Sequence, residues 1–335
     1  MNRALSHDAR AGRLREAPDL APELEARAVA RIPQVLPHEV VFGFFLALIW
    51  ARLVAQAGPF NPSSLAFLGC LLAPIAVIHW ARRRPTPLRW RVRLLLYAPL
   101  MGLSFFLLPS AFALLDLPSA DARIVGWEHA LLGEMNLAIQ PWEHPLLTDA
   151  MMLAYLFFFY YLVAGPAYYC IHDLGRFRKC FAGLFTVYGL GFIGYMAFPT
   201  AGPFRFLDFA EPLRTGWITE LAKPVVDAAS NGVDAFPSIH VAVSVYLLTF
   251  DAWHHRRRFW RMLAPCLALW ASTVYLRYHY GVDVLAGMVL AGIGLSVAAG
   301  YERFLSKTSR FFQPMSAEPA ADRASVRESL FPDEA

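Results

Sequence analysis

Eight apolar stretches, each near the length needed to cross a lipid bilayer, dominate this chain of 335 residues. A hydrocarbon core about 30 Å thick requires roughly 20 consecutive apolar residues in a helix. The predicted spans cover residues 39–57, 64–80, 93–115, 147–171, 180–199, 238–253, 259–277 and 280–300. Because backbone groups inside a bilayer must be hydrogen-bonded internally, the spans are expected to be helices. The sequence therefore predicts an all-α, polytopic membrane helix bundle.

The composition agrees with a membrane location. Hydrophobic residues make up 57% of the chain, against an apolar share of about 45–50% in soluble domains. The sixth stretch, 238–253, is short for a span and is kept because the charge pattern requires it. No cleavable signal peptide is predicted, since the first apolar run begins only near Val40. Residues 1–38 and 301–335 are expected to form solvated, mobile tails.

Basic residues orient the predicted spans. Cytoplasmic loops are enriched in Lys and Arg, and sixteen such residues fall on one set of connections: Arg82, Arg83, Arg84, Arg89, Arg91, Arg93, Arg176, Arg178, Lys179, Arg256, Arg257, Arg258, Arg261, Arg303, Lys307 and Arg310. The opposite loops hold only Arg123, Arg205, Arg214 and Lys223. Both termini are therefore predicted to be cytoplasmic. The net charge of +4 mostly reflects this asymmetry, and nucleic acid is not an expected partner.

Two short motifs each precede an apolar stretch on the predicted extracytoplasmic side. They are Phe236-Pro237-Ser238-Ile239-His240 and His279-Tyr280-Gly281-Val282-Asp283. Residues four apart share a helix face, so Asp283 can accept a hydrogen bond from one ring nitrogen of His279 and leave the other nitrogen basic. A nucleophile or general base needs such an arrangement. The Ser238 hydroxyl and the helix N-terminus beside it can receive a phosphate oxygen.

Two other interpretations of these motifs remain. A single membrane histidine is usually a structural hydrogen-bonding group, but two histidines at helix starts on one face make that explanation weaker. Two imidazoles and a carboxylate could also hold zinc or iron. The Pro-Ser lead-in has no role in a metal site, so neither a metal nor another cofactor is predicted. Cys70, Cys170, Cys180 and Cys266 lack metal-site spacing, and disulfides are not expected either.

Two extracytoplasmic segments are long enough to influence a site. Residues 116–146 have the spacing of an interfacial helix, and an amphipathic connector is favoured there over a lid that contacts substrate. In the segment 200–236, the run Phe198-Pro199-Thr200-Ala201-Gly202-Pro203-Phe204-Arg205 ends a helix and leaves Arg205 just outside the membrane.

At the two motifs the sequence resembles the type 2 phosphatidic acid phosphatase superfamily, and within it the inositol phosphorylceramide synthases and sphingomyelin synthases. Residues 236–240 are similar to the Pro-Ser-Gly-His motif, with Ile239 in place of Gly. Ser272, Arg277, His279 and Asp283 are similar to the last motif, in which Thr273 replaces an Arg. The first motif, Lys-(six)-Arg-Pro, is not found. The resemblance covers a six-helix core at about 93–300, and residues 39–80 add two accessory helices.

The resemblance implies that His279 attacks phosphorus to form a phosphohistidine, that His240 protonates the leaving oxygen, and that Asp283 holds His279. Arg205 and Arg277 are candidates for balancing the phosphoryl charge, with interfacial snorkelling as the alternative role. The expected donor is a membrane phospholipid, and the acceptor is a lipid or polyol hydroxyl, or water. Transfer is favoured over hydrolysis because the basic motif residues are missing. A catalytically silent lipid-binding protein is a third possibility, which the intact His240, His279 and Asp283 disfavour.

Overall fold

The computed structural model describes residues 35–84 and 86–311, without the side chains of 87 and 302–311. Every regular element in these ranges is a helix. In chain order they are α3 (Pro37–Ala57), α4 (Pro62–Arg83), α5 (Pro87–Leu95), α6 (Tyr97–Leu115), α7 (Asp121–Leu132), α8 (Met135–Ala138), the 3₁₀ helix η1 (Gln140–Trp142), α9 (Pro145–His172), α10 (Leu174–Ala197), α11 (Pro203–Phe206), α12 (Trp217–Ala229), α13 (Ile239–His254), α14 (Arg256–Tyr275) and α15 (Gly281–Phe311). The predicted all-α membrane bundle is confirmed.

All eight predicted spans are helical, but the count of membrane-spanning helices differs. Six meet the requirements of length and apolar composition: α3, α4, the α5–α6 pair, α9, α10 and α15. Helix α13 has only 16 residues, and α14 begins with three consecutive arginines. Charges near a helix end lower its mean hydropathy without preventing the apolar remainder from entering a bilayer. Length and composition thus support six of the eight predicted spans.

The chain ends of the described region also differ from the prediction. Helix α15 continues to Phe311, beyond the predicted boundary at about 300. No Gly or Pro occurs between Tyr301 and Phe311, so nothing in the sequence ends the helix there. Most of the two predicted tails, residues 1–34 and 312–335, lies outside the described residues.

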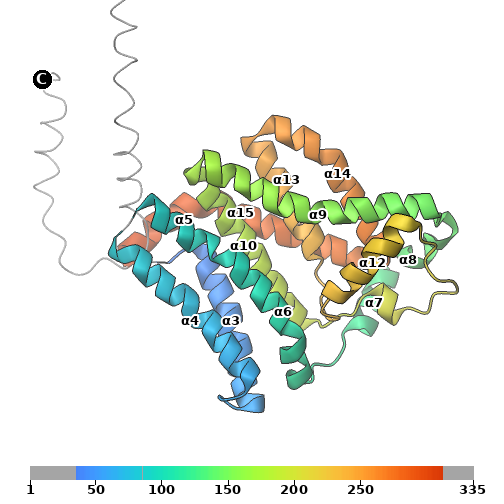
Figure 1. Cartoon of the computed structure of the whole chain (residues 1–335), viewed down its shortest axis with the longest axis horizontal. Coiled ribbons are helices and arrows are strands. Elements are labelled where there is room, and N and C mark those ends of the chain that lie inside the picture. The colour runs from blue at the N-terminus through green and yellow to red at the C-terminus, as the bar shows by residue number, and fades with distance from the viewer. Residues whose placement is uncertain (1–34, 85, 312–335) are drawn as a thin grey trace, which may run out of the picture.

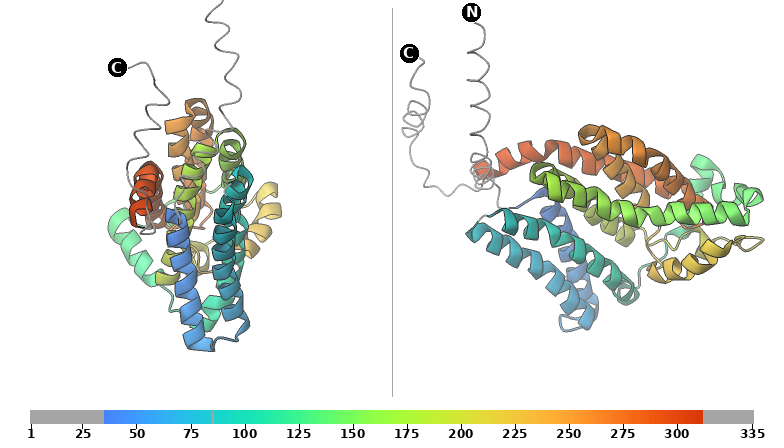
Figure 2. Two further views of the ribbon diagram at one scale, coloured as in Figure 1. Left: turned by 90° about the vertical axis from the view of Figure 1, so that its left-hand side faces the viewer. Right: turned by 45° about the horizontal axis from the view of Figure 1, so that its top comes forward.

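Helix α10 is the centre of the bundle. It contacts α3, α6, α9, α13 and α15, and 78% of its apolar window is buried. Figures 1 and 2 show α3–α6 on one side of α10, where they slant away from the direction of α9. Helices α9, α13, α14 and α15 run together on the other side. A buried ion pair from Arg93 Nε to Glu39 Oε1, at 2.6 Å, joins α5 to α3. The accessory pair α3–α4 is therefore packed into the same bundle as the predicted core.

Glycines allow the central helices to approach closely. A Cβ atom on Gly183 of α10 would lie 2.6 Å from the carbonyl oxygen of Gly294 on α15. One on Gly287 would lie 2.6 Å from the carbonyl oxygen of Ser238. Larger residues would force these helices apart. The second contact brings the first turns of α15 against the start of α13, where both histidine motifs lie.

Short elements cover this end of the bundle. Helix α7 contacts α15, α8 contacts α14, and α12 contacts α9. Figure 1 shows α7, α8 and α12 gathered around the right-hand end of α9, with α12 alongside that helix.

Candidate active site

The start of α13 positions His240. Ser238 is the N-cap residue, and its side-chain oxygen accepts a hydrogen bond from the Val241 N–H at 3.4 Å. The Ser238 N–H donates to the Asp283 carbonyl at 3.1 Å, which ties the start of α13 to the first turn of α15. A hydroxyl at the N-cap satisfies one of the free N–H groups of the first helical turn. His240 follows in that turn and is held beside α15.

The turn after α14 positions His279. Arg277 adopts a left-handed conformation with φ of 64°. The N–H groups of Tyr278 and His279 then both donate to the Thr273 carbonyl, at 3.1 and 2.9 Å. This is a common way of ending a helix. Asn136 of α8 adds a hydrogen bond from Nδ2 to the His279 carbonyl at 3.1 Å, so the backbone of His279 is fixed from two sides.

The two histidine rings face each other. Nε2 of His279 lies 3.4 Å from Nδ1 of His240, although the residues are far apart in sequence. The other nitrogen of His279, Nδ1, lies 2.9 Å from the Ala235 carbonyl oxygen. A carbonyl can only accept, so Nδ1 carries the proton and the lone pair of a neutral ring is on Nε2. The more nucleophilic nitrogen therefore points at His240.

Asp283 supports His279 less directly than the spacing predicted. Its Oδ2 is 3.5 Å from His279 Nδ1, longer than the Ala235 contact. The same oxygen accepts a 2.8 Å bond from the Tyr280 N–H. The carboxylate thus holds the turn before α15 and places a negative charge beside the ring. Orientation of His279 is shared between a carbonyl and a carboxylate.

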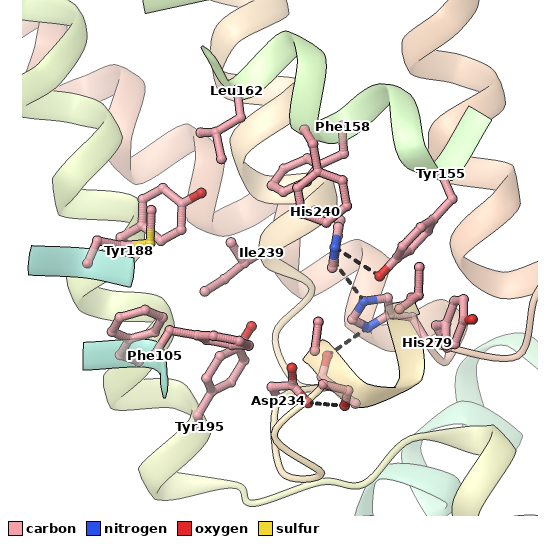
Figure 3. Close-up of a pocket in the computed structure, with 18 of the residues that line it drawn as sticks. Phe105, Tyr155, Phe158, Leu162, Tyr188, Tyr195, Asp234, Ile239, His240 and His279 are labelled. Carbon is pink, nitrogen blue, oxygen red and sulfur yellow. Dashed lines mark hydrogen bonds between the residues drawn. The ribbon is translucent and has the colours of Figure 1, made fainter. Parts of the chain in front are cut away.

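Tyr155 of α9 completes the contacts of His240 and was not identified from the sequence. Its hydroxyl lies 2.9 Å from His240 Nε2, and its ring packs at a tilt against Tyr278 with a centroid distance of 5.0 Å. Figure 3 shows Tyr155, His240 and His279 as a chain of linked polar groups. Tyr155 occurs among many aromatic residues of α9, so no sequence pattern separates it from residues that only pack.

A cavity of about 210 Å³ opens at the histidine pair, several times the ~30 Å³ of a water molecule in the liquid. Its aromatic lining consists of Phe105, Tyr155, Phe158, Phe159, Tyr188, Phe192, Tyr195, Phe204 and Tyr278. Met101 and Leu162 are among its aliphatic residues, and Ser230 and Asp234 add polar groups beside the histidines. No lysine or arginine lines this cavity, as far as the structure describes the chain. The walls come mainly from α6, α9, α10 and the segment before α13.

The other three predicted site residues lie away from the histidine pair or serve another contact. Arg277 is 5% exposed, and its Nη2 donates to Glu143 Oε1 at 2.7 Å. Arg205 is exposed and stacks over Phe204 at 5.0 Å. Ser238 is buried and caps α13. None of the three is among the residues that line the cavity, and their role in binding the phosphoryl group stays a prediction.

Helix α7 is more than a connector, because two of its carboxylates bind the site segments. Glu128 accepts hydrogen bonds from the N–H groups of Gly281 and Val282, at 3.1 and 2.8 Å. Asp121 accepts from the N–H groups of Ala201 and Gly202. The N-terminus of α15, an anion-binding position, is therefore occupied by a side chain of the protein itself.

The residues around the histidines do not resemble a metal centre. In the part of the chain that the structure describes, no group of three or more His, Cys, Asp or Glu side chains is arranged to hold a metal ion. The 3.4 Å contact between the two imidazole nitrogens suits a weak hydrogen bond that shares a proton.

No curated protein and no solved structure matches the chain. A family model described as the PAP2 superfamily matches residues 122–297.

Proposed function

The chain belongs to the PAP2 superfamily, the type 2 phosphatidic acid phosphatases, and from this we propose a membrane phosphotransferase. It moves a phospho-head group from a phospholipid to a lipid or polyol hydroxyl, as in the inositol phosphorylceramide synthase and sphingomyelin synthase branch. Membership of the superfamily supports phosphatase-type or phosphotransferase-type chemistry. The observation that carries the proposal is the pair of facing nitrogens, His279 Nε2 and His240 Nδ1, at the wall of a largely aromatic and aliphatic cavity.

In the first step, Nε2 of His279 attacks phosphorus. The Nε2–P bond forms, the bond from phosphorus to the leaving oxygen breaks, and the proton on His240 Nδ1 passes to that oxygen. The Ala235 carbonyl and Asp283 stabilise the proton on Nδ1 of His279 and the positive charge that develops on its ring. Tyr155 positions His240 through Nε2.

In the second step, an acceptor hydroxyl attacks the phosphohistidine. Its oxygen bonds to phosphorus, the P–Nε2 bond breaks, and the hydroxyl proton passes to His240 Nδ1. The enzyme returns to its starting protonation state. Water in place of the hydroxyl gives hydrolysis by the same route, so the acceptor alone separates a transferase from a phosphatase.

The charge of the cavity favours transfer of a phosphodiester. A phosphomonoester carries close to two negative charges near neutral pH, and the lining of the cavity has no Lys or Arg to balance them. A phosphodiester carries one negative charge. Apolar side chains of α6, α9 and α10 in the same cavity, such as Phe105, Leu162 and Phe192, suit acyl chains. A lipid would enter sideways, between α6 and α9.

The proposal is tested by trapping the covalent intermediate. Full-length protein in liposomes is incubated with a phospholipid labelled at phosphorus, and an acid-labile, base-stable adduct is measured. We expect the adduct with the wild type, none with His279→Ala, and much slower formation with His240→Ala. His129→Ala is the matched control, because that exposed histidine lies on α7 away from the pair. An adduct that persists in His279→Ala would rule out the assigned nucleophile.

The same liposomes separate transfer from hydrolysis. Ceramide, inositol or a diacylglycerol whose acyl chains differ from those of the donor is added as the acceptor, and each labelled transfer product is separated from the labelled product of hydrolysis. The proposal requires that a hydroxyl acceptor takes most of the label. Release to water alone, at every acceptor concentration, would make the protein a lipid phosphatase.

A further inference from the structure

Asp234 brings a negative charge to the wall of the cavity, near the histidine pair (Figure 3). It lies between α12 and α13, where the Ser230 hydroxyl donates to its Oδ1 at 2.9 Å. The next residue, Ala235, donates its N–H to the Thr200 carbonyl at 3.0 Å. The Ala235 carbonyl accepts the hydrogen bond from His279 Nδ1. Asp234 is thus next in sequence to Ala235, which orients the proposed nucleophile His279. The hydrogen bond from Ala235 to Thr200 holds both residues in place.

No lysine or arginine in the described residues forms an ion pair with this carboxylate, and His279 is the nearby protein group whose positive form would stabilise it. In the described part of the chain Asp234 has no ion-pair partner, and burial raises its pKa because the charged form loses hydration. Lys223 is paired with Asp227, and its ammonium lies over the rings of Phe204 and Tyr278. Arg205 is exposed. A cation that entered the cavity would therefore meet a carboxylate that has a hydroxyl donor but no lysine or arginine partner.

Aromatic rings surround the same space. Tyr155 and Tyr195 line the cavity together with Asp234, and Phe158 packs against the His240 ring at a centroid distance of 4.5 Å. Figure 3 shows Tyr195 and Phe105 on the side of the cavity opposite Tyr155. Ring faces attract ammonium groups, and aromatic cages recognise quaternary ammonium ligands. Rings plus one carboxylate, without Lys or Arg, select a cationic group over a neutral or anionic one.

We propose that the Asp234 end of the cavity binds the ammonium group of a zwitterionic phospho-head group whose phosphate lies against His240 and His279. The inference rests on the proposed function, which places phosphorus at the histidines. A short carbon linker separates phosphate from ammonium in such head groups, so both charges fit one cavity. The donor is then a phospholipid with an amino or quaternary ammonium head group. A polyol head group has no cation to pair with the Asp234 carboxylate. A phosphomonoester would bring a second negative charge into the same cavity.

The experiment measures head-group preference. Full-length protein in liposomes of fixed acyl composition receives phosphatidylcholine, phosphatidylethanolamine, phosphatidylglycerol or phosphatidylinositol as the labelled donor, and kcat/KM for head-group transfer is determined. We expect the two ammonium lipids to exceed the two polyol lipids by at least about tenfold, equivalent to about 1.4 kcal/mol. In Asp234→Asn, which keeps the shape of the side chain, that preference falls at least about tenfold. Asp208→Asn is the matched control, because Asp208 is an exposed acid outside the cavity.

A binding measurement covers the case in which Asp234→Asn or the wild type is inactive. Dodecylphosphocholine is titrated into His279→Ala with and without Asp234→Asn, in nanodiscs, and the stability of each protein is followed by thermal denaturation. Binding that weakens at least about tenfold without Asp234 supports the inference. Polyol lipids preferred by the wild type, or an unchanged preference and unchanged binding in Asp234→Asn, would overturn it while leaving the phosphotransferase intact. A wild type that forms no phosphohistidine and transfers no head group would instead overturn the proposed function.

Discussion

The charge balance of the cavity depends on where single basic side chains point. Arg277 could have faced the histidines, since it is only two residues from His279. Its left-handed backbone turns the side chain toward Glu143 and the Glu211 carbonyl instead. A buried arginine that already has a carboxylate partner would lose that ion pair if it moved to a phosphate. Substrate charge therefore has to be matched by the histidines themselves and by the substrate's own cation.

Head-group preference is expected to depend on pH through Asp234. The carboxyl is charged above its pKa and neutral below it. Burial raises that pKa, so the charge is lost at a higher pH than for an ordinary carboxyl near 3.9. The preference for an ammonium head group should therefore be full at high pH and disappear as pH falls through the raised pKa. The measurement is the ratio of kcat/KM for phosphatidylcholine and phosphatidylglycerol from about pH 8 to about pH 5, because kcat/KM reports the free enzyme.

The ratio isolates Asp234 from its titrating neighbours. His279 and His240 take part in the reactions of both lipids, so their effect on the rate is common to the two kcat/KM values in the ratio. The Ser230 hydroxyl and the phenols of Tyr155 and Tyr195 do not titrate between those pH values. In Asp234→Asn the ratio should be flat across the series. A wild-type ratio that stays constant, or rises on acidification, would contradict a carboxylate that binds the ammonium group.

Sequence reasoning found residues whose role is local in sequence and missed those whose role is made by folding. His279 and Asp283 are four apart at a helix start, and His240 follows a Pro-Ser turn, so spacing alone brought them into consideration. Tyr155 lies on α9, and Asp234 lies in the segment before α13. Both become site residues only because folding brings these two segments to the histidine pair. Arg277 was assigned by its place in a motif, and its ion pair with Glu143 could not be predicted from the sequence.

Among the elements, α7 shows how a peripheral helix can support a site that it does not line. Glu128 and Asp121 are both buried and both accept backbone hydrogen bonds, from the start of α15 and from the segment before α11. A carboxylate at a helix N-terminus is also favoured by the helix dipole. Helix α7 thus connects the two backbone segments on either side of the histidine pair.

Glu128→Gln is expected to slow the reaction, although Glu128 does not line the cavity. The amide can accept only one of the two backbone bonds without placing its NH₂ group against an N–H, and the charge at the α15 N-terminus is lost. Removing charged hydrogen bonds of this kind costs about 1–3 kcal/mol. We expect a lower melting temperature and slower phosphohistidine formation, with little change in KM, because the change acts on the backbone that holds His279.

Glu134→Gln provides the matched control. Glu134 also follows α7, but it is 63% exposed and its contact with His129 is 3.9 Å long. Exposed contacts of this kind contribute little to stability. Equal melting temperatures and equal rates in the two variants would mean that Glu128 has no positioning role.

The helices themselves were predictable because each is encoded by a long run of apolar residues. All eight predicted stretches fold as helices, since some 20 apolar residues leave few alternatives in a bilayer. The connector role favoured for 116–146 underestimated α7. Its carboxylates are ordinary surface residues by sequence, and only their approach to Gly281 and Ala201 reveals the contact.

For the whole molecule, the remaining question is which side of the membrane the site faces. Helix α13 starts at the site and ends at His254, about 24 Å away at 1.5 Å per residue. Arg256, Arg257 and Arg258 follow directly and are therefore at the opposite end of the bundle from the histidines. Because arginines concentrate on the cytoplasmic side, we propose that the site faces the extracytoplasmic side. Substrate would then come from the outer leaflet.

Cysteine labelling tests this orientation. The four native cysteines are first replaced by alanine or serine, and single cysteines are introduced at Glu211 and Arg257, both exposed. Glu211 is a better position than Gly232, whose φ of 75° disfavours any side chain. A membrane-impermeant maleimide should label Glu211→Cys in intact cells and Arg257→Cys only after permeabilisation. The test also shows whether the short α13 crosses the bilayer, because Glu211 and Arg257 lie on opposite sides only if α13 crosses. Helix α14 leads from Arg257 back to the site, so it crosses if α13 crosses. Labelling of both cysteines in sealed cells would mean that neither α13 nor α14 crosses the bilayer. Labelling of Arg257→Cys alone would invert the bundle, place the histidines in the cytoplasm, and exclude an outer-leaflet donor even if His279 proved to be the nucleophile.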